Sequence, residues 1–377
     1  KELEIDFEEE LLEIENKIIE ITGETINLRS PKQVGTLLFE TLGLPVIKKT
    51  KTGFSTDSSV LEELLYMGES DIPGKILRYR ELDKLQSTYV KVLPKLINEK
   101  SGRIHTNFSL HTAATGRLSS THPNLQNIPV RSIDGRRLRK AFIATPGMIL
   151  LSADYSQVEL RLLAHFSKDE VMVEAFNNDD DIHTQTAGEI LGKEISDVSK
   201  EERSNAKAVN FGLMYGQSSF GLSKELKISR NDAKEYITKY FERFSSVKSY
   251  LDSLKEKAEI DGFAQTMHGR KRPLPEINSS NRNIKSQAER VAINSPIQGT
   301  AADIIKLAMI KIDQEFQERN IEAKMILQVH DELIFELKEQ DLEAVHQIVK
   351  SNMESVVSLD VPLKVDVKVG VNWLDLK

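Results

Sequence analysis

Two acidic motifs that lie far apart in the sequence could act together if folding brought them to one place. Asp154 follows the apolar run Ile149–Ala153, which we predict to be a buried strand that holds the acid rigidly. Asp331 and Glu332 follow His330 at the joint between two apolar β-like runs, where a tight hairpin would carry them at its tip. Because side chains alternate along a strand, we expect Asp331 to be the principal ligand of this pair.

Carboxylates brought together in this way repel each other and need cations. The chain has no cysteine, and a site built from oxygen ligands favours Mg²⁺ or Mn²⁺ over zinc. Two such ions about 4 Å apart could activate a 3′-hydroxyl and stabilise a leaving pyrophosphate. The spacing alone is weak support, because aspartate is common at strand ends and in turns. A structural role for both acids therefore stays open at this point.

A third pattern combines cations and aromatic rings on one predicted helix. Arg203, Lys207, Phe211 and Tyr215 follow one another at intervals of four residues, so they form one slowly drifting stripe over about 18 Å. Two cations could clamp a triphosphate while two rings contact a base or sugar. The alternative is a solvated basic start that runs into a buried aromatic end.

Glu159 also has two interpretations. The spacing Ser156-x-x-Glu159 is that of a capping box, in which the glutamate closes the start of a helix. Its carboxylate could instead lie near the sugar of an incoming nucleotide and block a 2′-hydroxyl. The two roles can coexist.

The elements that must position these residues follow a helical, mixed, helical, mixed order. Apolar residues at Leu11, Ile14, Ile18 and Ile21 predict an amphipathic helix. Cap signals at Ser30-Pro31-Lys32-Gln33 predict another helix start, and residues 48–58 predict a polar loop. Further predicted elements are a strand at 148–153, helices within 170–260, a helix at 301–319 and strands at 324–329 and 333–337. The chain thus leaves one sheet and re-enters it, which predicts an α+β fold.

Composition bounds the class of protein. The chain of 377 residues carries a formal net charge of −7, which argues against a protein coated in basic surface. No apolar run approaches the ~20 residues that cross a bilayer, so we expect a cytoplasmic protein with no membrane association. Basic residues do cluster locally, at Lys48, Lys49 and Lys51, at Arg131, Arg136, Arg137, Arg139 and Lys140, and at Arg270, Lys271 and Arg272.

Four motifs in this order resemble those of family A DNA polymerases of the bacterial DNA polymerase I type. They are Thr115-Gly116-Arg117-Leu118-Ser119-Ser120, Asp154-Tyr155-Ser156-Gln157-Val158-Glu159-Leu160-Arg161, the stripe Arg203–Gly216, and Gln328-Val329-His330-Asp331-Glu332. Together they are far more specific than any one of them, and the resemblance runs from about residue 20 to Trp373.

The resemblance implies a role for each matching residue. Asp154, Asp331 and the backbone carbonyl of Tyr155 would hold two Mg²⁺ ions, for which Mn²⁺ could substitute. Glu332 and Lys207 complete the implied catalytic set. The residues implied to bind a deoxynucleoside triphosphate are Arg203, Lys207, Phe211, Tyr215, Glu159, His183, Gln157 and Ser156. Those implied to contact primer–template DNA are Arg117, Arg290, Asn294, Gln298, His330, Lys48, Lys49, Lys51, Asn124 and Gln126.

The implied architecture is a right hand with an antiparallel palm sheet and helical fingers. Its parts would be a thumb at 1–100, which lacks an N-terminal portion, a palm at 101–170 and 276–377, and fingers at 171–275. Phe211, in place of tyrosine, is similar to family members that discriminate against dideoxynucleotides. We expect no nuclease domain within this chain, and a monomer whose fingers close over a correct nucleotide.

Two other classes of function stay open on sequence grounds. A metal-dependent nuclease would account for the carboxylates but not for the stripe of cations and rings. A DNA-binding module without activity would need neither Asp154 nor Asp331.

Overall fold

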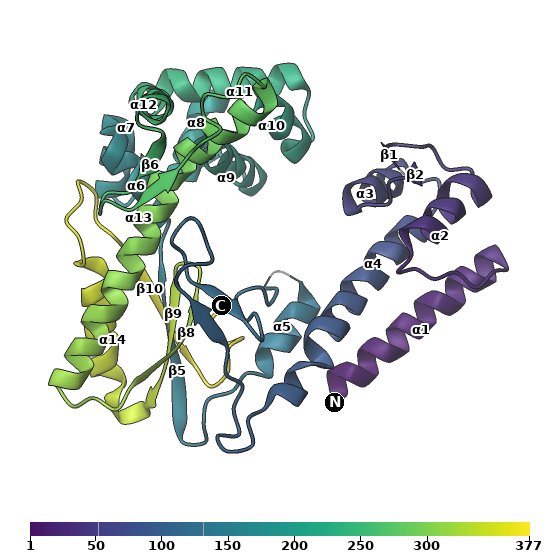
Figure 1. Ribbon diagram of the computed structural model, residues 1–377, viewed down its shortest axis with the longest axis horizontal. Helices are drawn as coiled ribbons and strands as arrows, with labels where there is room; N and C mark the ends of the chain where they lie inside the picture. The colour runs from purple at the N-terminus through teal and green to yellow at the C-terminus, as the bar shows by residue number, and fades with distance from the viewer. Residues whose placement is uncertain (52, 131) are drawn as a thin grey trace. The chain divides into compact units, whose positions relative to one another are not determined.

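The computed structural model describes residues 1–51, 53–130 and 132–377 (Figure 1), so Arg131 of the second basic cluster and residue 52 of the predicted polar loop lie outside the described residues. The chain divides into two compact units. The first comprises residues 1–107 and 121–142, and the second residues 108–120 and 143–377. Within these described ranges, no helix is both long and apolar enough to cross a membrane.

The first unit is mainly helical, as predicted. Its α-helices are α1 (Glu2–Thr22), α2 (Pro31–Gly35), α3 (Ser58–Met67), α4 (Ile72–Leu85) and α5 (Ile133–Lys140). π-Helical turns occupy Thr36–Thr41 and Gln86–Val90, and a 3₁₀ helix occupies Leu93–Leu96. The predicted loop contains the short antiparallel pair β1 (Lys49–Thr50) and β2 (Gly53–Phe54).

Local signals in this unit are mostly confirmed. Leu11, Ile14, Ile18 and Ile21 all lie in α1, as predicted, and the first three are buried whereas Ile21 is exposed near the end of the helix. The Ser30 side chain caps α2 by accepting a hydrogen bond from the backbone N–H of Gln33. The Gln33 side chain accepts from Asn27 rather than from Ser30, so the expected reciprocal bond is not made.

The second unit is built on a four-stranded antiparallel sheet in the order β10-β5-β9-β8. Its strands are β5 (Met148–Tyr155), β8 (Lys324–Val329), β9 (Glu332–Lys338) and β10 (Val365–Gly370). The first of these is separated from the others in sequence by helices, so the chain does leave and re-enter one sheet. The predicted α+β class is confirmed.

Helices separate the two visits to the sheet. They are α6 (Val158–Ser167), α7 (Glu170–Asn177), α8 (Ile182–Leu191), α9 (Lys200–Met214), α10 (Ser219–Leu226), α11 (Arg230–Arg243) and α12 (Ser245–Asp261). The small pairs are β3 (Asn107–Ser109) with β4 (Ser119–Thr121), and β6 (Phe263–Gln265) with β7 (Lys271–Pro273). Helix α14 (Leu342–Glu354) and short 3₁₀ turns at Ile195–Asp197 and Glu339–Asp341 complete the unit.

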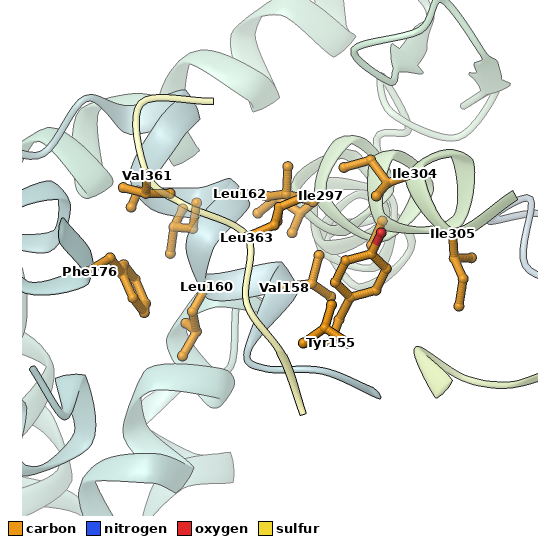
Figure 2. Close-up of a cluster of buried hydrophobic side chains, with 14 of the residues drawn as sticks. Tyr155, Val158, Leu160, Leu162, Phe176, Ile297, Ile304, Ile305, Val361 and Leu363 are labelled. Atoms are coloured by element: carbon orange, nitrogen blue, oxygen red, sulfur yellow. The ribbon is translucent and has the colours of Figure 1, made fainter. Parts of the chain in front are cut away.

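Strand alternation decides which face of the sheet carries the core. Leu151, Ala153 and Tyr155 of β5 belong to one buried cluster with residues of α6, α7, α14 and the long helix α13 (Arg282–Glu318). Figure 2 shows part of this cluster, in which Tyr155 lies near Ile304 and Ile305 of α13. Asp154 therefore lies on the opposite face of the sheet, away from the apolar core.

Helix α13 (Arg282–Glu318) starts well before the predicted Ala301. A proline inside a helix cannot donate the helical hydrogen bond and usually limits the helix. Here Pro296 is buried inside the helix, and the hydroxyls of Ser295 and Thr300 donate to the carbonyls of Val291 and Pro296. The helix consequently runs from α12 and β6 at one end to α14 at the other (Figure 1).

We expect Leu162→Ala to lower the free energy of unfolding by roughly 2–5 kcal/mol, because Leu162 is fully buried in the cluster of Figure 2 and its removal leaves a cavity. Guanidinium unfolding followed by the fluorescence of Trp373, the single tryptophan, reports on this unit. Ile260→Ala is the control, since Ile260 is 83% exposed and should change stability by less than about 0.5 kcal/mol. Equal effects of the two changes would contradict the described core.

Candidate active site

Three acidic side chains lie side by side across the sheet. Asp154 of β5 is the direct cross-strand partner of Glu332 on β9 and of Asp366 on β10. Directly opposed residues of antiparallel strands project from the same face, about 5 Å apart. The sheet therefore concentrates negative charge on the face that does not carry the core.

The hairpin that carries Asp331 is as tight as the sequence predicts. Val329 and Glu332 are partners across it, so His330 and Asp331 form a two-residue turn, with His330 at φ 55°. The backbone N–H of Tyr155 donates to the carbonyl oxygen of Asp331 at 3.1 Å, which fixes the turn beside the end of β5.

Strand alternation does not by itself separate Asp331 from Glu332, and the choice of Asp331 as the principal ligand stays a prediction. Asp331 belongs to the turn, and both of these acids act electrostatically on Asp154. Glu332 has the larger effect of the two. Glu332 is thus an integral part of the acidic group.

Burial perturbs the pKa values of Asp154 and Asp331, so a nearby positive charge would stabilise their ionised forms. Burial, followed by the charge of Glu332, raises the pKa of Asp154 to about 6. Burial also raises the pKa of Asp331, an effect that the Arg117 guanidinium opposes. Lys377 contributes a cation, since its Nζ lies 2.8 Å from Oε2 of Glu332.

The donor set fits hard divalent cations, because every nearby ligand is a carboxylate oxygen. Glu332 keeps its Oε1 atom buried without a hydrogen-bond partner, which leaves one oxygen available for a ligand. Within the described residues, no three acids or histidines are already arranged around one point as a metal site. Ions held by Asp154 and Asp331 would need further ligands from a bound substrate.

Glu159 accepts two hydrogen bonds that tie separate elements together. Nη2 of Arg117 lies 2.6 Å from Oε1 of Glu159, and the hydroxyl of Tyr215 donates to Oε2. The predicted capping box is wrong, because α6 is capped by Gln157 in a left-handed conformation, with no side-chain bond. Burial raises the pKa of Glu159, and the bond from Tyr215 and the charge of Arg117 lower it.

The loop that carries Arg117 is held by a buried acid of α13. Arg270 donates to Asp303 Oδ1 through Nε at 2.9 Å and Nη2 at 2.7 Å. Its guanidinium lies against Gly116, where an added Cβ would come within 2.7 Å of Nε. Lys306 donates to the carbonyl of Gly116 at 2.9 Å. Glycine is needed at this position both for its φ of 82° and for this close approach.

Arg117 extends from this loop toward both acidic motifs. Besides its contact with Glu159, Nη2 lies 3.6 Å from Oδ1 of Asp331. The structure thus brings the first, second and fourth sequence motifs together around one guanidinium.

The predicted stripe on α9 is confirmed as one helix, with Tyr215 at its C-cap. Arg203 pairs through Nε with Asp181, the N-cap of α8, while Lys207 is exposed. The rings of Phe211 and Tyr215 are stacked with centroids 6.4 Å apart. The four residues therefore present cations at one end and rings at the other.

Helix α13 supplies residues next to the end of this stripe. Gln298 lies near enough to the Tyr215 hydroxyl to lower the pKa of Tyr215, against the larger raising effect of burial. Arg290 packs on Gly216, where an added Cβ would lie 3.3 Å from its Cγ. Asn294 has a buried Oδ1 atom with no partner.

Several of the predicted site residues have a buried polar atom without a hydrogen-bond partner. Besides those of Glu332 and Asn294, these atoms include Nε of Arg117 and Oε1 of Gln157, within the part of the chain that the structure describes. A buried polar group without a partner costs about 1–3 kcal/mol, so a ligand that paired with these atoms would relieve that cost.

Some predicted residues are less closely tied to the acids. Ser156 and Gln157 directly precede α6. Together with Arg203 they line a hollow of about 600 Å³. The remaining predicted DNA contacts of the first unit, whose role stays a prediction, are Lys48, Lys49, Lys51, Asn124 and Gln126. Of these, Lys48 pairs with Asp57 at 2.7 Å, and Asn124 accepts from the backbone of Gln126.

The sequence did not reveal the residues that form ion pairs with the predicted site residues or with their supporting loop. Asp181, Asp303 and Lys377 carry no motif of their own, and each gains its role from a partner distant in sequence. Asn210 was missed as well, because it carries no motif of its own and its hydrogen bonds go to His183 and Thr186 on α8.

Comparison with known proteins gives a consistent result. The sequence matches the profile of DNA polymerase family A over residues 1–375. DNA polymerase I of Caldicellulosiruptor bescii is 52% identical over 372 residues, which cover 99% of this chain and 44% of that protein. DNA polymerase I of Bacillus subtilis (strain 168) is 50% identical over 368 residues, with 97% and 42% covered. This chain spans less than half the length of these curated relatives.

A solved structure agrees over the whole chain. The POL domain of Pol1 from M. smegmatis, in complex with DNA primer-template and dNTP, matches with a TM-score of 0.95 and 43% identity. The match covers 100% of this chain and 66% of that one. With a family profile that extends over nearly every residue and relatives that are about half identical, this chain belongs to DNA polymerase family A.

Proposed function

We propose that this chain catalyses template-directed addition of deoxynucleotides to a primer 3′ end, with release of pyrophosphate. The observation that carries the proposal is the junction of three groups: the acids Asp154, Asp331 and Glu332, the bridging carboxylate of Glu159, and the cation and ring stripe of α9. The dNTP and primer-template in the complex of the M. smegmatis domain support the same assignment of substrates.

Asp154 and Asp331, with the carbonyl oxygen of Tyr155, would hold two Mg²⁺ ions. Such ions, when bound, supply a Lewis acid and a lowered pKa for the attacking hydroxyl. Mn²⁺ suits the same oxygen ligands. The chain's own contribution is to hold these oxygens rigidly at the end of β5 and in the turn pinned by Tyr155.

The stripe on α9 would orient the nucleotide. Lys207 and Arg203 neutralise a triphosphate, which is the largest charge in the substrate, and an arginine can bind it through two nitrogens at once. Arg203 of α9 donates through Nε to Asp181, and this contact holds the guanidinium against the N-terminus of α8. Phe211 and Tyr215 offer flat faces to the sugar and base.

DNA would contact the second unit through Arg117, Arg290, Asn294, Gln298 and His330. Minor-groove acceptors occupy nearly the same positions in every Watson–Crick pair, so such donors can test pair shape without reading sequence. In this proposal, residues 1–100 form a thumb, 101–170 and 276–377 a palm, and 171–275 fingers that close over a correct nucleotide. The chain would act as a monomer in the cytoplasm.

Primer extension with Mg²⁺ and four deoxynucleotides tests the function directly. We expect templated growth from the unmodified chain. Asp331→Asn should lower extension by on the order of 1,000-fold, because several kcal/mol of charge stabilisation is lost. Duplex affinity, measured by fluorescence anisotropy, should change little.

The other classes of function give different products in the same assay. Shortening of the primer would identify a nuclease, and binding with neither product would identify a non-catalytic module. Normal turnover by Asp331→Asn would remove Asp331 from the catalytic group.

Sugar selection provides a second test, at Glu159. Glu159→Ala should raise the relative use of ribonucleotides by about 10- to 100-fold, because removal of the carboxylate opens space for a 2′-hydroxyl. Glu159→Gln is the matched control, since it keeps the shape without the charge. If both variants relax sugar choice equally, charge rather than shape makes the selection, and if neither does, Glu159 is no sugar gate.

The acidic group also predicts a pH-dependent stability without metal. The pKa of Asp154 in the folded chain, about 6, exceeds its ordinary value of 3.8, so folding favours the protonated form. That contribution is complete below about pH 4 and is lost as pH rises through about 6.

With a chelator at about pH 7.5, Asp154→Asn should therefore raise the free energy of unfolding by roughly 1–3 kcal/mol while extension is lost. Urea unfolding of both proteins measures this difference, which should shrink toward about pH 4. A variant that is less stable at both pH values would mean that Asp154 stabilises the fold.

A further inference from the structure

A buried polar network joins helices α8 and α9 behind the proposed nucleotide face. His183 and Thr186 on α8 and Asn210 on α9 are each at most 1% exposed. Nδ2 of Asn210 lies 3.0 Å from Nδ1 of His183 and 3.1 Å from Oγ1 of Thr186. Two helices that would otherwise meet through apolar contacts thus share a set of hydrogen bonds.

The Thr186 hydroxyl sets the direction of these bonds. It donates to the carbonyl of Ile182 at 2.7 Å, which uses its only proton. The hydroxyl oxygen can then accept one hydrogen from the Asn210 amide, and the second amide hydrogen goes to Nδ1 of His183. Oδ1 of Asn210 lies 3.2 Å from the same hydroxyl, a longer contact.

An imidazole that accepts at Nδ1 must carry its proton on Nε2 if it is neutral. Burial and the charges of Lys207 and Arg203 lower the pKa of His183 to about 4, against the opposing effect of Asp181, so the neutral form is expected near pH 7. Nδ1 is already engaged by Asn210, which leaves Nε2–H as the donor that can meet a ligand.

We propose that Asn210 is a positioning residue that fixes His183 in its Nε2–H tautomer, so that the ring offers one neutral donor to the triphosphate beside the cations Arg203 and Lys207. This role rests on the proposed function, in which His183 binds the nucleotide. The ring of Phe211 lies beside the imidazole, with the two ring centroids 5.9 Å apart, and His183 is only 1% exposed. The donor is therefore preorganised in a dry setting, where a hydrogen bond to phosphate is strong.

The tautomer can be measured on the unmodified chain without any substrate. Nitrogen NMR of the ¹⁵N-histidine-labelled protein, with His183→Gln used to assign the signal, should show an unprotonated Nδ1 and a protonated Nε2 near pH 7. A protonated Nδ1, whether in the other neutral tautomer or in a charged ring, would overturn the proposal. This readout stands even if the chain fails to extend primers, in which case only the proposed function falls.

Two variants then test whether the tautomer matters. Asn210→Asp replaces the donor to Nδ1 with an acceptor, so Nδ1 should become protonated and the KM for deoxynucleotides should rise by about 10- to 100-fold. Thr186→Val, which removes the hydroxyl that orients the amide, should raise KM by about 3- to 10-fold with a smaller change in kcat.

Thr238→Val is the matched control. The Thr238 hydroxyl also donates to the carbonyl four residues earlier, at 3.0 Å, but it lies on the exposed face of α11. It should leave both the His183 signal and KM unchanged. A folded Asn210→Asp or Thr186→Val protein that shifts the tautomer and leaves KM unchanged would overturn the positioning role, as would an equal effect of Thr238→Val.

Discussion

The pairing register of β5 with β9 is the constraint on which the rest of the site depends. It sets Asp154 directly opposite Glu332 on the face of the sheet away from the core. Like charges in this position destabilise a sheet unless a cation compensates them. A slip of one residue would move Asp154 into the apolar cluster and Tyr155 out of it. The acids are thus held together by the same apolar contacts that fix Leu151 and Phe335 in the core.

Two cations close to the acids, Lys377 and Arg117, compensate part of this negative charge. Lys377 meets Glu332, and Arg117 lies between Glu159 and Asp331. Arg117 in turn depends on the loop that Arg270 and Lys306 hold against α13. A buried ion pair adds little net stability, since removal of its charges from water is costly. These pairs are better understood as devices that place a charge than as sources of folding energy.

The sequence was most informative where chemistry depends on short spacing. The strand before Asp154, the tight turn at His330–Asp331 and the helical stripe on α9 could all be predicted, because each depends on neighbours within a few residues. The early start of α13 could not, since tertiary burial of Pro296 outweighs its local cost.

Partners that are distant in sequence could not be predicted either, because local spacing carries no information about them. Ser156-x-x-Glu159 has the spacing of a capping box, yet the carboxylate is taken by Arg117 and Tyr215, which the local sequence does not reveal. Asp303 and Asn210 look like ordinary polar residues of long helices until their partners are known. The resemblance to family A polymerases carried the assignment of roles where local physics could not.

The two hydrogen bonds that Glu159 accepts would couple two kinds of selectivity in the proposed function. Its carboxylate accepts hydrogen bonds from the hydroxyl of Tyr215 and from the guanidinium of Arg117. If Tyr215 and Glu159 contact the base and the sugar as proposed, a movement of the Tyr215 ring would shift the Glu159 carboxylate as well. Choice of base and choice of sugar would then be thermodynamically linked in the proposed reaction, so a lineage that relaxed one would have to rebuild the other.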